Sequence, residues 1–348
     1  MVAIKDGAGL FSPLADERTR LGRRLEERCR ETLGDQDNRL AEALHHALAS
    51  PGKFVRSLLM LDSCRAVGGD PERVFPAALG VEYGHMASLI HDDIMDGDTS
   101  RRGQDAAHVK YGVDTAVLAG DALIFLAYLG HLDCFERGVS AERTLSAIRT
   151  LSLTCLAMCQ GQALETAAQA RLDLSEDDYF AIIGSKTAAF CRAVCEIGAI
   201  LGGGSAAEIE QLGRFGHHLG VAFQIVDDLL CYDTAGTNLG KSALSDLRNQ
   251  RVTLPIIYAL RDSSPDQRAR ISALFTPTSA NGSADGSDLL ERYSRLVQIL
   301  QRTHALDHAR AIAQTHTQSA LTSLDLLQPS EPRDRMTALA TLLMVRDR

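Results

Sequence analysis

The chain is short of positive charge, and this shortage excludes some functions. Its 348 residues contain 36 Lys and Arg against 45 Asp and Glu, a net charge of −9 at pH 7. Phosphate backbones demand basic surfaces, so this balance argues against a nucleic-acid partner. An unbroken apolar run of about 18 residues, which would indicate a transmembrane segment, is also missing. The segment 1–25 lacks the apolar core of a signal peptide, so we expect a cytoplasmic protein.

A disulfide framework is missing as well. The eight cysteines are scattered along the chain, which predicts reduced thiols. Cys155 with Cys159, and Cys191 with Cys195, have the spacing of one helical turn. Zn²⁺ binding is the alternative, but no second pair of ligand type stands beside either pair. We therefore expect these cysteines to act as small buried hydrophobic residues.

Alternating strand patterns and internal repeats are also lacking. Helix-periodic segments rich in Ala and Leu cover 16–33, 114–137, 141–170, 208–230, 289–327 and 335–345. The stretch 262–288 collects Ser, Pro, Gly and Asn and predicts helix fragments around a mobile loop, and 1–15 predicts a flexible N-terminus. No clear break divides the rest. We expect 1–348 to form one all-α domain, a helical bundle around a deep central cavity.

Two aspartate clusters about 130 residues apart carry most of the chemical information. Each ends an apolar, helix-periodic run. On a helix, Asp92 and Asp96 lie about 40° apart, and Asp93 completes an arc of about 100°. Asp227 and Asp228 form the second cluster. Carboxylates buried without a partner are very unfavourable, so two such faces opposed across a cavity predict a site for Mg²⁺ that shares its coordination with a diphosphate.

Basic residues suited to that diphosphate stand close to these clusters in short, distinctive settings. A turn after Asp96 brings Arg101 and Arg102 beside the carboxylates, and arginine binds phosphate oxygens in a bidentate fork. Other cations follow or precede small residues: Lys53, Arg56, Lys186 and Lys241. His85 lies seven residues before Asp92, about 20° away in azimuth, so it shares the face that points to the cavity.

These motifs resemble those of the trans-isoprenyl diphosphate synthases, or polyprenyl synthetases, and in particular geranylgeranyl diphosphate synthases. The first aspartate-rich motif corresponds to 88–96 followed by Arg101-Arg102-Gly103. The second corresponds to 223–228, with Gly240-Lys241 and Ser245-Asp246-Leu247 after it. Gly161-Gln162 and Lys186-Thr187-Ala188 match landmarks between them. The resemblance runs from about 52 to 255, and the order and spacing of its motifs are highly specific.

The resemblance implies the isoprenoid synthase fold, a homodimer, and Mg²⁺-dependent head-to-tail condensation of isopentenyl diphosphate with an allylic diphosphate. Two or three Mg²⁺ ions per active site would be held by Asp92, Asp93, Asp96, Asp227 and Asp228. The departing diphosphate would be neutralised by these ions with Arg101, Lys186 and Lys241. Isopentenyl diphosphate would be bound by Lys53, Arg56, His85 and Arg102. Thr187 and Gln224 complete the expected substrate contacts.

The chain departs from the family pattern at several positions. In the early basic motif, Pro51, Phe54 and Ser57 replace the usual Gly, Arg and Pro. Cys231 stands where the second motif usually has its third aspartate, which weakens the expected second metal site. Asp105 replaces the proline that usually follows Arg-Arg-Gly.

The expected product is geranylgeranyl diphosphate. In the family, bulky residues four and five positions before the first motif end chain growth early, whereas here Ser88 and Ala87 are small. Phe125 and Tyr128 are candidates for the floor of the cavity. A longer-chain polyprenyl diphosphate synthase is the nearest alternative. A terpene cyclase or a non-catalytic partner subunit would share the fold, but the isopentenyl diphosphate residues disfavour the first and the intact first motif disfavours the second.

Overall fold

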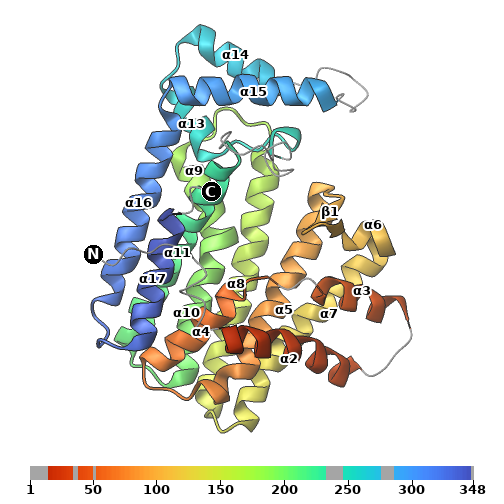
Figure 1. Ribbon diagram of the computed structural model, residues 1–348, viewed down its shortest axis with the longest axis vertical. Helices are drawn as coiled ribbons and strands as arrows, with labels where there is room; N and C mark the ends of the chain where they lie inside the picture. The colour runs from red at the N-terminus through yellow and green to blue at the C-terminus, as the bar shows by residue number, and fades with distance from the viewer. Residues whose placement is uncertain (1–14, 34–37, 50–51, 233–245, 276–285, 346–348) are drawn as a thin grey trace. The chain divides into compact units, whose positions relative to one another are not determined.

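The computed structural model describes residues 15–33, 38–49, 52–232, 246–275 and 286–345, and these are almost wholly helical (Figure 1). Two-residue strands β1 (Ser100–Arg101) and β2 (Gln104–Asp105) form an antiparallel hairpin. The helices are α2 (Ala15–Leu33), α3 (Arg39–Leu48), α4 (Val55–Ala66), α5 (Pro71–Asp96), α6 (Ala107–Tyr111), α7 (Val113–Glu136), α8 (Ala141–Ala168), α9 (Glu176–Ile183), the π-helix η1 (Gly184–Ala188), α10 (Ala189–Gly202), α11 (Ala206–Leu230), α13 (Leu254–Arg261), α14 (Pro265–Phe275), α15 (Gly286–Arg302), α16 (Ala305–Leu324) and α17 (Glu331–Val345).

Local sequence signals set the bounds of α5, the helix that carries the first aspartate motif. The Asp70 side chain caps its N-terminus by accepting from the Glu72 amide at 3.0 Å. Pro76 inside the helix has no amide to offer the Glu72 carbonyl, which instead accepts from the Arg137 guanidinium at 3.2 Å. Gly97 adopts φ 65° and ends the helix, so Asp96 is its last residue.

Two sequence expectations need correction. The predicted helix over 289–327 is interrupted between α15 and α16, where His304 adopts φ 53°, which no helix continues through. Cys159 is exposed and Cys155 is half-buried, so this pair does not pack as buried hydrophobic residues, whereas Cys191 and Cys195 do. The eight cysteines, all within the described residues, form no disulfide.

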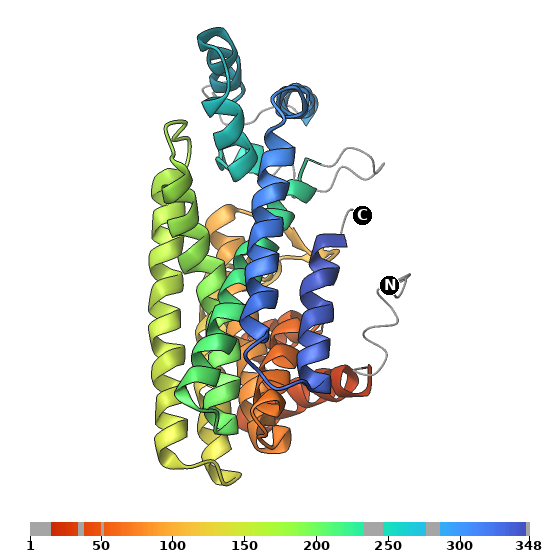
Figure 2. The ribbon, with the colours of Figure 1, turned by 90° about the vertical axis from the view of Figure 1, so that its left-hand side faces the viewer.

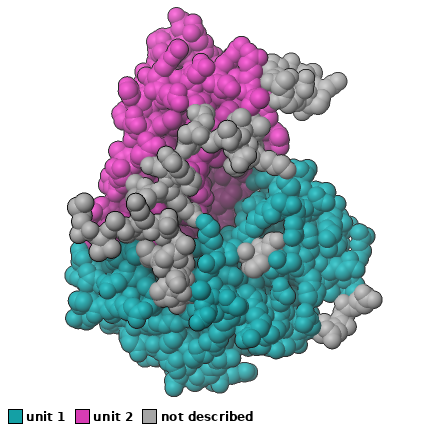
Figure 3. Space-filling view, viewed as in Figure 1, with its two compact units in different colours: residues 1–152, 193–213, 324–338 teal, residues 153–192, 214–323, 339–348 magenta. Residues whose placement is uncertain are grey.

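The segment predicted as helix fragments around a loop contains α14, while 276–285 and the N-terminal residues 1–14 lie outside the described residues. The chain divides into two compact units, 1–152 with 193–213 and 324–338, and 153–192 with 214–323 and 339–348 (Figure 3). A single domain over 1–348 stays a prediction.

In the first unit, α5 and α7 lie side by side (Figure 1). The Tyr83 hydroxyl of α5 donates to the Leu25 carbonyl of α2 at 2.5 Å, which ties α2 to the same core. By length and composition α7 could also cross a membrane, with a mean hydropathy of 1.6 over its most apolar window, so the expectation that no such segment exists needs qualification. A core helix passes the same test, and one face of α7, including Leu123 and Ala127, is buried.

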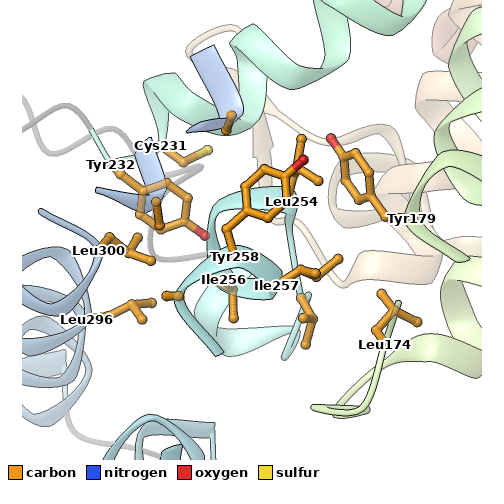
Figure 4. Packing of buried hydrophobic residues seen from close by; sticks show 14 of the residues in the cluster. Leu174, Tyr179, Cys231, Tyr232, Leu254, Ile256, Ile257, Tyr258, Leu296 and Leu300 are labelled. Carbon is orange, nitrogen blue, oxygen red and sulfur yellow. The ribbon is translucent and has the colours of Figure 1, made fainter. Parts of the chain in front are cut away.

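In the second unit, the core gathers around α13, whose side chains point in several directions into apolar neighbours (Figure 4). Leu254 and Ile256 are almost fully buried, and Leu296 and Leu300 of α15 belong to the same buried cluster. Each such side chain stabilises the fold by about 1.5–3 kcal/mol. Helices α13, α14 and α15 contact one another, and α15 is seen nearly end-on in the turned view (Figure 2).

Candidate active site

The first aspartate motif occupies the last turn of α5 in the first unit. Asp92 and Asp96 are half-buried, so their carboxylates remain accessible to a ligand. Asp93 is only 4% exposed, and its carboxylate accepts from the Arg101 Nε at 2.7 Å and also from an Arg101 terminal nitrogen. Burial raises the pKa of Asp93, and the Arg101 guanidinium opposes that rise. Asp93 therefore fixes Arg101 on β1 beside the motif, and its role as a metal ligand stays a prediction.

A cluster of cations lies at the start of α4 and at the tip of the hairpin. The Arg56 guanidinium donates to His85 Nε2 at 3.4 Å. Since arginine has no lone pair to offer, His85 is the acceptor and carries its proton on Nδ1. Burial, and then the Arg56 and Arg102 guanidiniums, hold the pKa of His85 well below its ordinary value. His85 is neutral as a result, between two permanent positive charges.

Arg102 completes this cluster from the hairpin. It adopts φ 51°, and a Cβ on Gly52 would lie 2.9 Å from its terminal nitrogen, so a larger residue there would require the guanidinium to shift. Burial, and then the neighbouring Arg101 and Arg56 guanidiniums, lower the pKa of Arg102. Lys53, in the same loop as Gly52, is exposed. The arrangement favours an anion, because these like charges repel one another, and its role as a substrate site stays a prediction.

The departure at Phe54 has a structural explanation. Phe54 precedes α4 with φ 56°, a strained conformation for a bulky residue, and its side chain is 6% exposed. Its ring packs against Gly22 of α2, where an added Cβ would lie 3.6 Å from the ring, an ordinary contact distance. Phe54 thus anchors the loop that carries Lys53 by packing, where the usual arginine would be charged.

The second aspartate motif, on α11 in the second unit, is held by a chain of hydrogen bonds. The Thr187 hydroxyl donates to the Gln224 side-chain oxygen at 2.9 Å, and the Gln224 amide donates to Asp228 at 2.9 Å. The buried Tyr179 hydroxyl donates to the other Asp228 oxygen at 2.7 Å. Burial, and then the Asp246 carboxylate, raise the pKa of Asp228 to about 7. Thr187 and Gln224, predicted to contact substrate, hold Asp228 here.

Lys186 lies on the π-helix η1, a local widening that often marks functional sites. A Cβ on Gly161 would lie 2.5 Å from the Lys186 amide nitrogen, so α8 can approach η1 only through glycine. The Lys186 ammonium contacts Glu165 of α8 at 2.6 Å, and Glu165 lies 3.8 Å from Arg251. The sequence patterns did not indicate Tyr179, Glu165 or Arg251, since none of them stands beside an aspartate motif.

Cys231 is buried, and its thiol donates to the Asp227 carbonyl at 3.5 Å. Its single proton can go instead to the Asp246 carboxylate. Burial raises the pKa of Asp246, and Arg251 and Cys231 oppose that rise. Asp246 therefore supplies a carboxylate close to the position where the family's third aspartate is missing.

The residues expected to set product length are placed differently from one another. Ala87 is 1% exposed, whereas Ser88 is half-buried and its hydroxyl donates to the His85 carbonyl at 2.8 Å. Phe125 is 69% exposed on the outer face of α7, so it closes no cavity within a single copy of the chain, and that prediction is wrong for the isolated chain. Its neighbour Tyr128 bonds to Ser152 at 3.1 Å. Lys241 lies outside the described residues.

The carboxylates fit Mg²⁺ by their chemistry. Among the described residues, no three His, Cys, Asp or Glu side chains converge closely enough to hold a metal ion alone. Mg²⁺ needs fewer protein ligands than such a cluster, because it binds one or two carboxylates and completes its coordination with water and phosphate oxygens. The raised pKa of Asp228, caused by burial, then by Asp246 and in lesser part by Asp227, shows negative charges that a cation would stabilise.

Comparison with known proteins identifies the family. Residues 37–291 match the polyprenyl synthetase family. The chain is 36% identical over 348 residues, covering 100% of both chains, to a short chain isoprenyl diphosphate synthase from Methanothermobacter thermautotrophicus. It is 32% identical over 295 residues to the geranylgeranyl diphosphate synthase of Sulfolobus acidocaldarius, covering 82% of this chain and 84% of that one. The crystal structure of geranylgeranyl pyrophosphate synthetase from Pyrococcus horikoshii matches with a TM-score of 0.87 at 29% identity, covering 98% of this chain and 99% of that one.

The fold and these matches define an all-α prenyltransferase with the isoprenoid synthase fold. The chain belongs to the polyprenyl synthetase family. The fold class and the enzyme class predicted from the sequence are thereby confirmed.

Proposed function

We propose that the enzyme joins isopentenyl diphosphate head-to-tail to an allylic diphosphate in the presence of Mg²⁺ and releases geranylgeranyl diphosphate. The observation that carries this proposal is the pair of guanidiniums, Arg56 and Arg102, that act on the neutral His85, with Lys53 exposed in the loop before α4. A terpene cyclase has little need for a second diphosphate site. A non-catalytic partner subunit usually has a damaged first aspartate motif, and here Asp92, Asp93 and Asp96 are intact.

The allylic diphosphate is the substrate that ionises. Two or three Mg²⁺ ions held by Asp92, Asp96, Asp227 and their neighbours would act as Lewis acids that stabilise the diphosphate as it leaves. Arg101, fixed by Asp93, and Lys186, fixed by Glu165, donate hydrogen bonds to the same leaving group, together with Lys241. Arg101 and Lys186 are already oriented by carboxylates, so these two need little reorganisation when charge develops.

The second substrate supplies the electrons. Arg56, Arg102 and Lys53 hold the diphosphate of isopentenyl diphosphate, so that its double bond attacks the allylic carbon as the carbon–oxygen bond breaks. The new carbon–carbon bond leaves a tertiary cation, which loses a proton to the released diphosphate and becomes an alkene one isoprene unit longer. Apolar walls exclude water, which would otherwise divert the cation to an alcohol.

Product length follows from the small residues before the first motif. The half-buried Ser88 leaves room for a farnesyl tail where a bulky residue would end growth. The names of relatives from S. acidocaldarius and P. horikoshii support geranylgeranyl diphosphate as the product. A longer product stays the alternative, because Phe125 does not close the cavity within one copy of the chain.

We also propose that the enzyme acts as a homodimer in the cytoplasm. The outer face of α7 exposes large apolar side chains over its whole length: Val113, Val117, Leu118, Phe125, Leu129, Leu132 and Phe135. Exposed apolar patches of this kind mark association sites, and a second copy of the chain presents the same self-complementary helix. Among the described helices, α7 alone is long and apolar enough to cross a membrane. A second copy of the chain that covers this face would account for its apolar surface.

Incubating the purified protein with Mg²⁺, isopentenyl diphosphate and each of three primers tests the function directly. The primers are dimethylallyl, geranyl and farnesyl diphosphate, and the products are sized after dephosphorylation. We expect geranylgeranyl diphosphate from all three, and no product when EDTA replaces Mg²⁺. Cyclic hydrocarbon products, or no condensation with any primer, would contradict the proposal.

A further inference from the structure

A buried acid lies beside the proposed isopentenyl diphosphate site. Glu82 of α5 is 3% exposed. Its Oε1 lies 2.9 Å from the Ser57 hydroxyl and 3.3 Å from the Ser57 amide nitrogen. The same hydroxyl lies 2.6 Å from the Ala78 carbonyl. Ser57 is the residue that stands where the family pattern has proline, which could provide neither of these donors.

The three distances indicate two states of Glu82. A hydroxyl has one proton, and the Ala78 carbonyl can only accept. When Ser57 donates to Ala78, its contact with Glu82 is favourable only if the Glu82 carboxyl is neutral and donates. When Glu82 is ionised, the hydroxyl rotates and donates to the carboxylate. Ser57 can therefore satisfy Glu82 in both protonation states without any movement of heavy atoms.

The charges that act on Glu82 come from the same site. Arg56 on α4 and Arg102 on the hairpin favour the carboxylate, whereas burial raises the pKa of Glu82. His85, one turn further along α5, faces the same two arginines and is neutral. Among the described residues, Arg56 and Arg102 are the charged groups that act on Glu82, and Glu82 in turn acts on Arg102. A diphosphate between the arginines would take over the role of an ionised Glu82 as their counter-ion.

We propose that Glu82 changes its protonation state with the occupancy of this site, being the counter-ion of Arg56 and Arg102 when the site is empty and a neutral acid when a diphosphate is bound. The proton comes from solvent and passes to Glu82 Oε1, which then donates to the Ser57 hydroxyl. This inference rests on the proposed function, because it needs a diphosphate at Arg56 and Arg102. Binding takes up a proton, so the affinity for isopentenyl diphosphate falls as pH rises.

Isothermal titration calorimetry measures the proton directly. Isopentenyl diphosphate is titrated into the full-length protein without Mg²⁺ or primer, so that no turnover occurs, in two buffers of different ionisation enthalpy. We expect the wild type to take up more protons than Glu82→Gln, by about one per site at most. Glutamine mimics the neutral acid, because its amide can donate to Ser57. Its affinity should therefore lose pH dependence, so that wild type and variant differ several-fold at pH 9 and agree near pH 6.

Equal proton uptake in the wild type and Glu82→Gln would overturn the inference. Absence of any binding to the wild type would contradict the proposed function instead, so the two failures are distinguishable. Ser57→Ala should reduce the difference in uptake, whereas Ser63→Ala, a fully buried serine on the same helix, should not. If Glu82→Gln does not fold, infrared difference spectra of the wild type give the answer. The neutral carboxyl stretching band should grow on ligand addition, and its absence would overturn the inference.

Discussion

At the scale of single residues, the hydroxyl of Tyr179 is the least expected part of the site. It is buried and donates to Asp228, next to the proposed metal ligand Asp227. Tyr179→Phe should leave the core packed but remove about 1–3 kcal/mol of hydrogen bonding to a charged group. We expect kcat to fall about tenfold and the Mg²⁺ concentration for half-maximal activity to rise.

A matched tyrosine distinguishes this role from a loss of stability. Tyr83→Phe removes the hydrogen bond to the Leu25 carbonyl, in a setting equally buried. It should lower the melting temperature and leave the Mg²⁺ dependence unchanged. If both variants showed the same Mg²⁺ dependence as the wild type, Tyr179 would be structural only.

The accessible carboxylates of the first motif make a second prediction. Asp92→Ala or Asp96→Ala should lower turnover by several orders of magnitude with the fold intact, because ionisation loses its electrophile. Asp105→Ala, an exposed carboxylate on the nearby hairpin, is the control and should retain activity. Circular dichroism checks the fold. Near-normal activity of both motif variants would contradict the assignment of these aspartates as Mg²⁺ ligands.

The prediction for product length concerns Ser88, which is only half-buried and can be replaced by a larger side chain. Ser88 is half-buried, whereas Ala87 is 1% exposed. Ser88→Phe should therefore shift the products towards farnesyl diphosphate or shorter. Ala87→Phe should do the same but with a marked loss of stability, because a phenyl ring overpacks a closed site. Chromatography of the dephosphorylated products would decide, and an unchanged distribution in both variants would refute this account of the tail.

At the scale of elements, a histidine pair joins α11 to α16. The Nδ1 atoms of His218 and His316 lie 3.1 Å apart, so one ring donates and the other accepts, and His316 stacks on Phe180. Burial, and then His218, lower the pKa of His316 to about 4. The pKa of His316 is lower in the folded state than in the unfolded state. The contribution of this histidine to the free energy of unfolding is therefore fully present above about pH 6.5 and is lost as pH falls towards 4.

Melting temperatures between pH 7.5 and 5 measure this loss. The wild type should lose several degrees more than His316→Gln, which has no titrating ring at this contact. His45→Gln, an exposed histidine elsewhere, should behave like the wild type. An identical pH profile for His316→Gln and the wild type would contradict the prediction.

Much of this architecture could be read from the chain, for reasons that lie in particular elements. The apolar residues before Asp92 have helical periodicity, and Gly97 marks the end of the helix. Both α5 and the position of its aspartate motif in the last turn therefore follow from the local sequence. The π-helix at Lys186 could not be predicted, because no local signal distinguishes it from the helices on either side, and its close contact with Gly161 joins residues distant in sequence. The partners Tyr179 and Glu165 are distant in sequence from the groups they hold, and neither lies in a motif, so no pattern indicates them.

At the scale of the whole molecule, the exposed face of α7 predicts self-association. Leu118 and Phe125 are 57% and 69% exposed. Leu118→Glu with Phe125→Glu should convert the dimer to a monomer, because buried charges without partners oppose association. Light scattering after size exclusion measures the mass. Leu326→Glu, where the leucine is 71% exposed outside α7, should remain dimeric, and a monomeric wild type would refute the proposal.

The π-helix has a further consequence for how this chain can vary between lineages. Five residues, Gly184 to Ala188, form a wide turn that carries one residue more than an α-helix of the same length would need. Loss of one residue there would restore a regular α-helix and leave the helices on either side in register, because the wide turn already absorbs the extra residue. Phe190 and Cys191 of α10, both buried, would then keep their places in the core. The backbone around Lys186 would change instead, so a chain one residue shorter here should still fold but should hold Lys186 differently against Glu165.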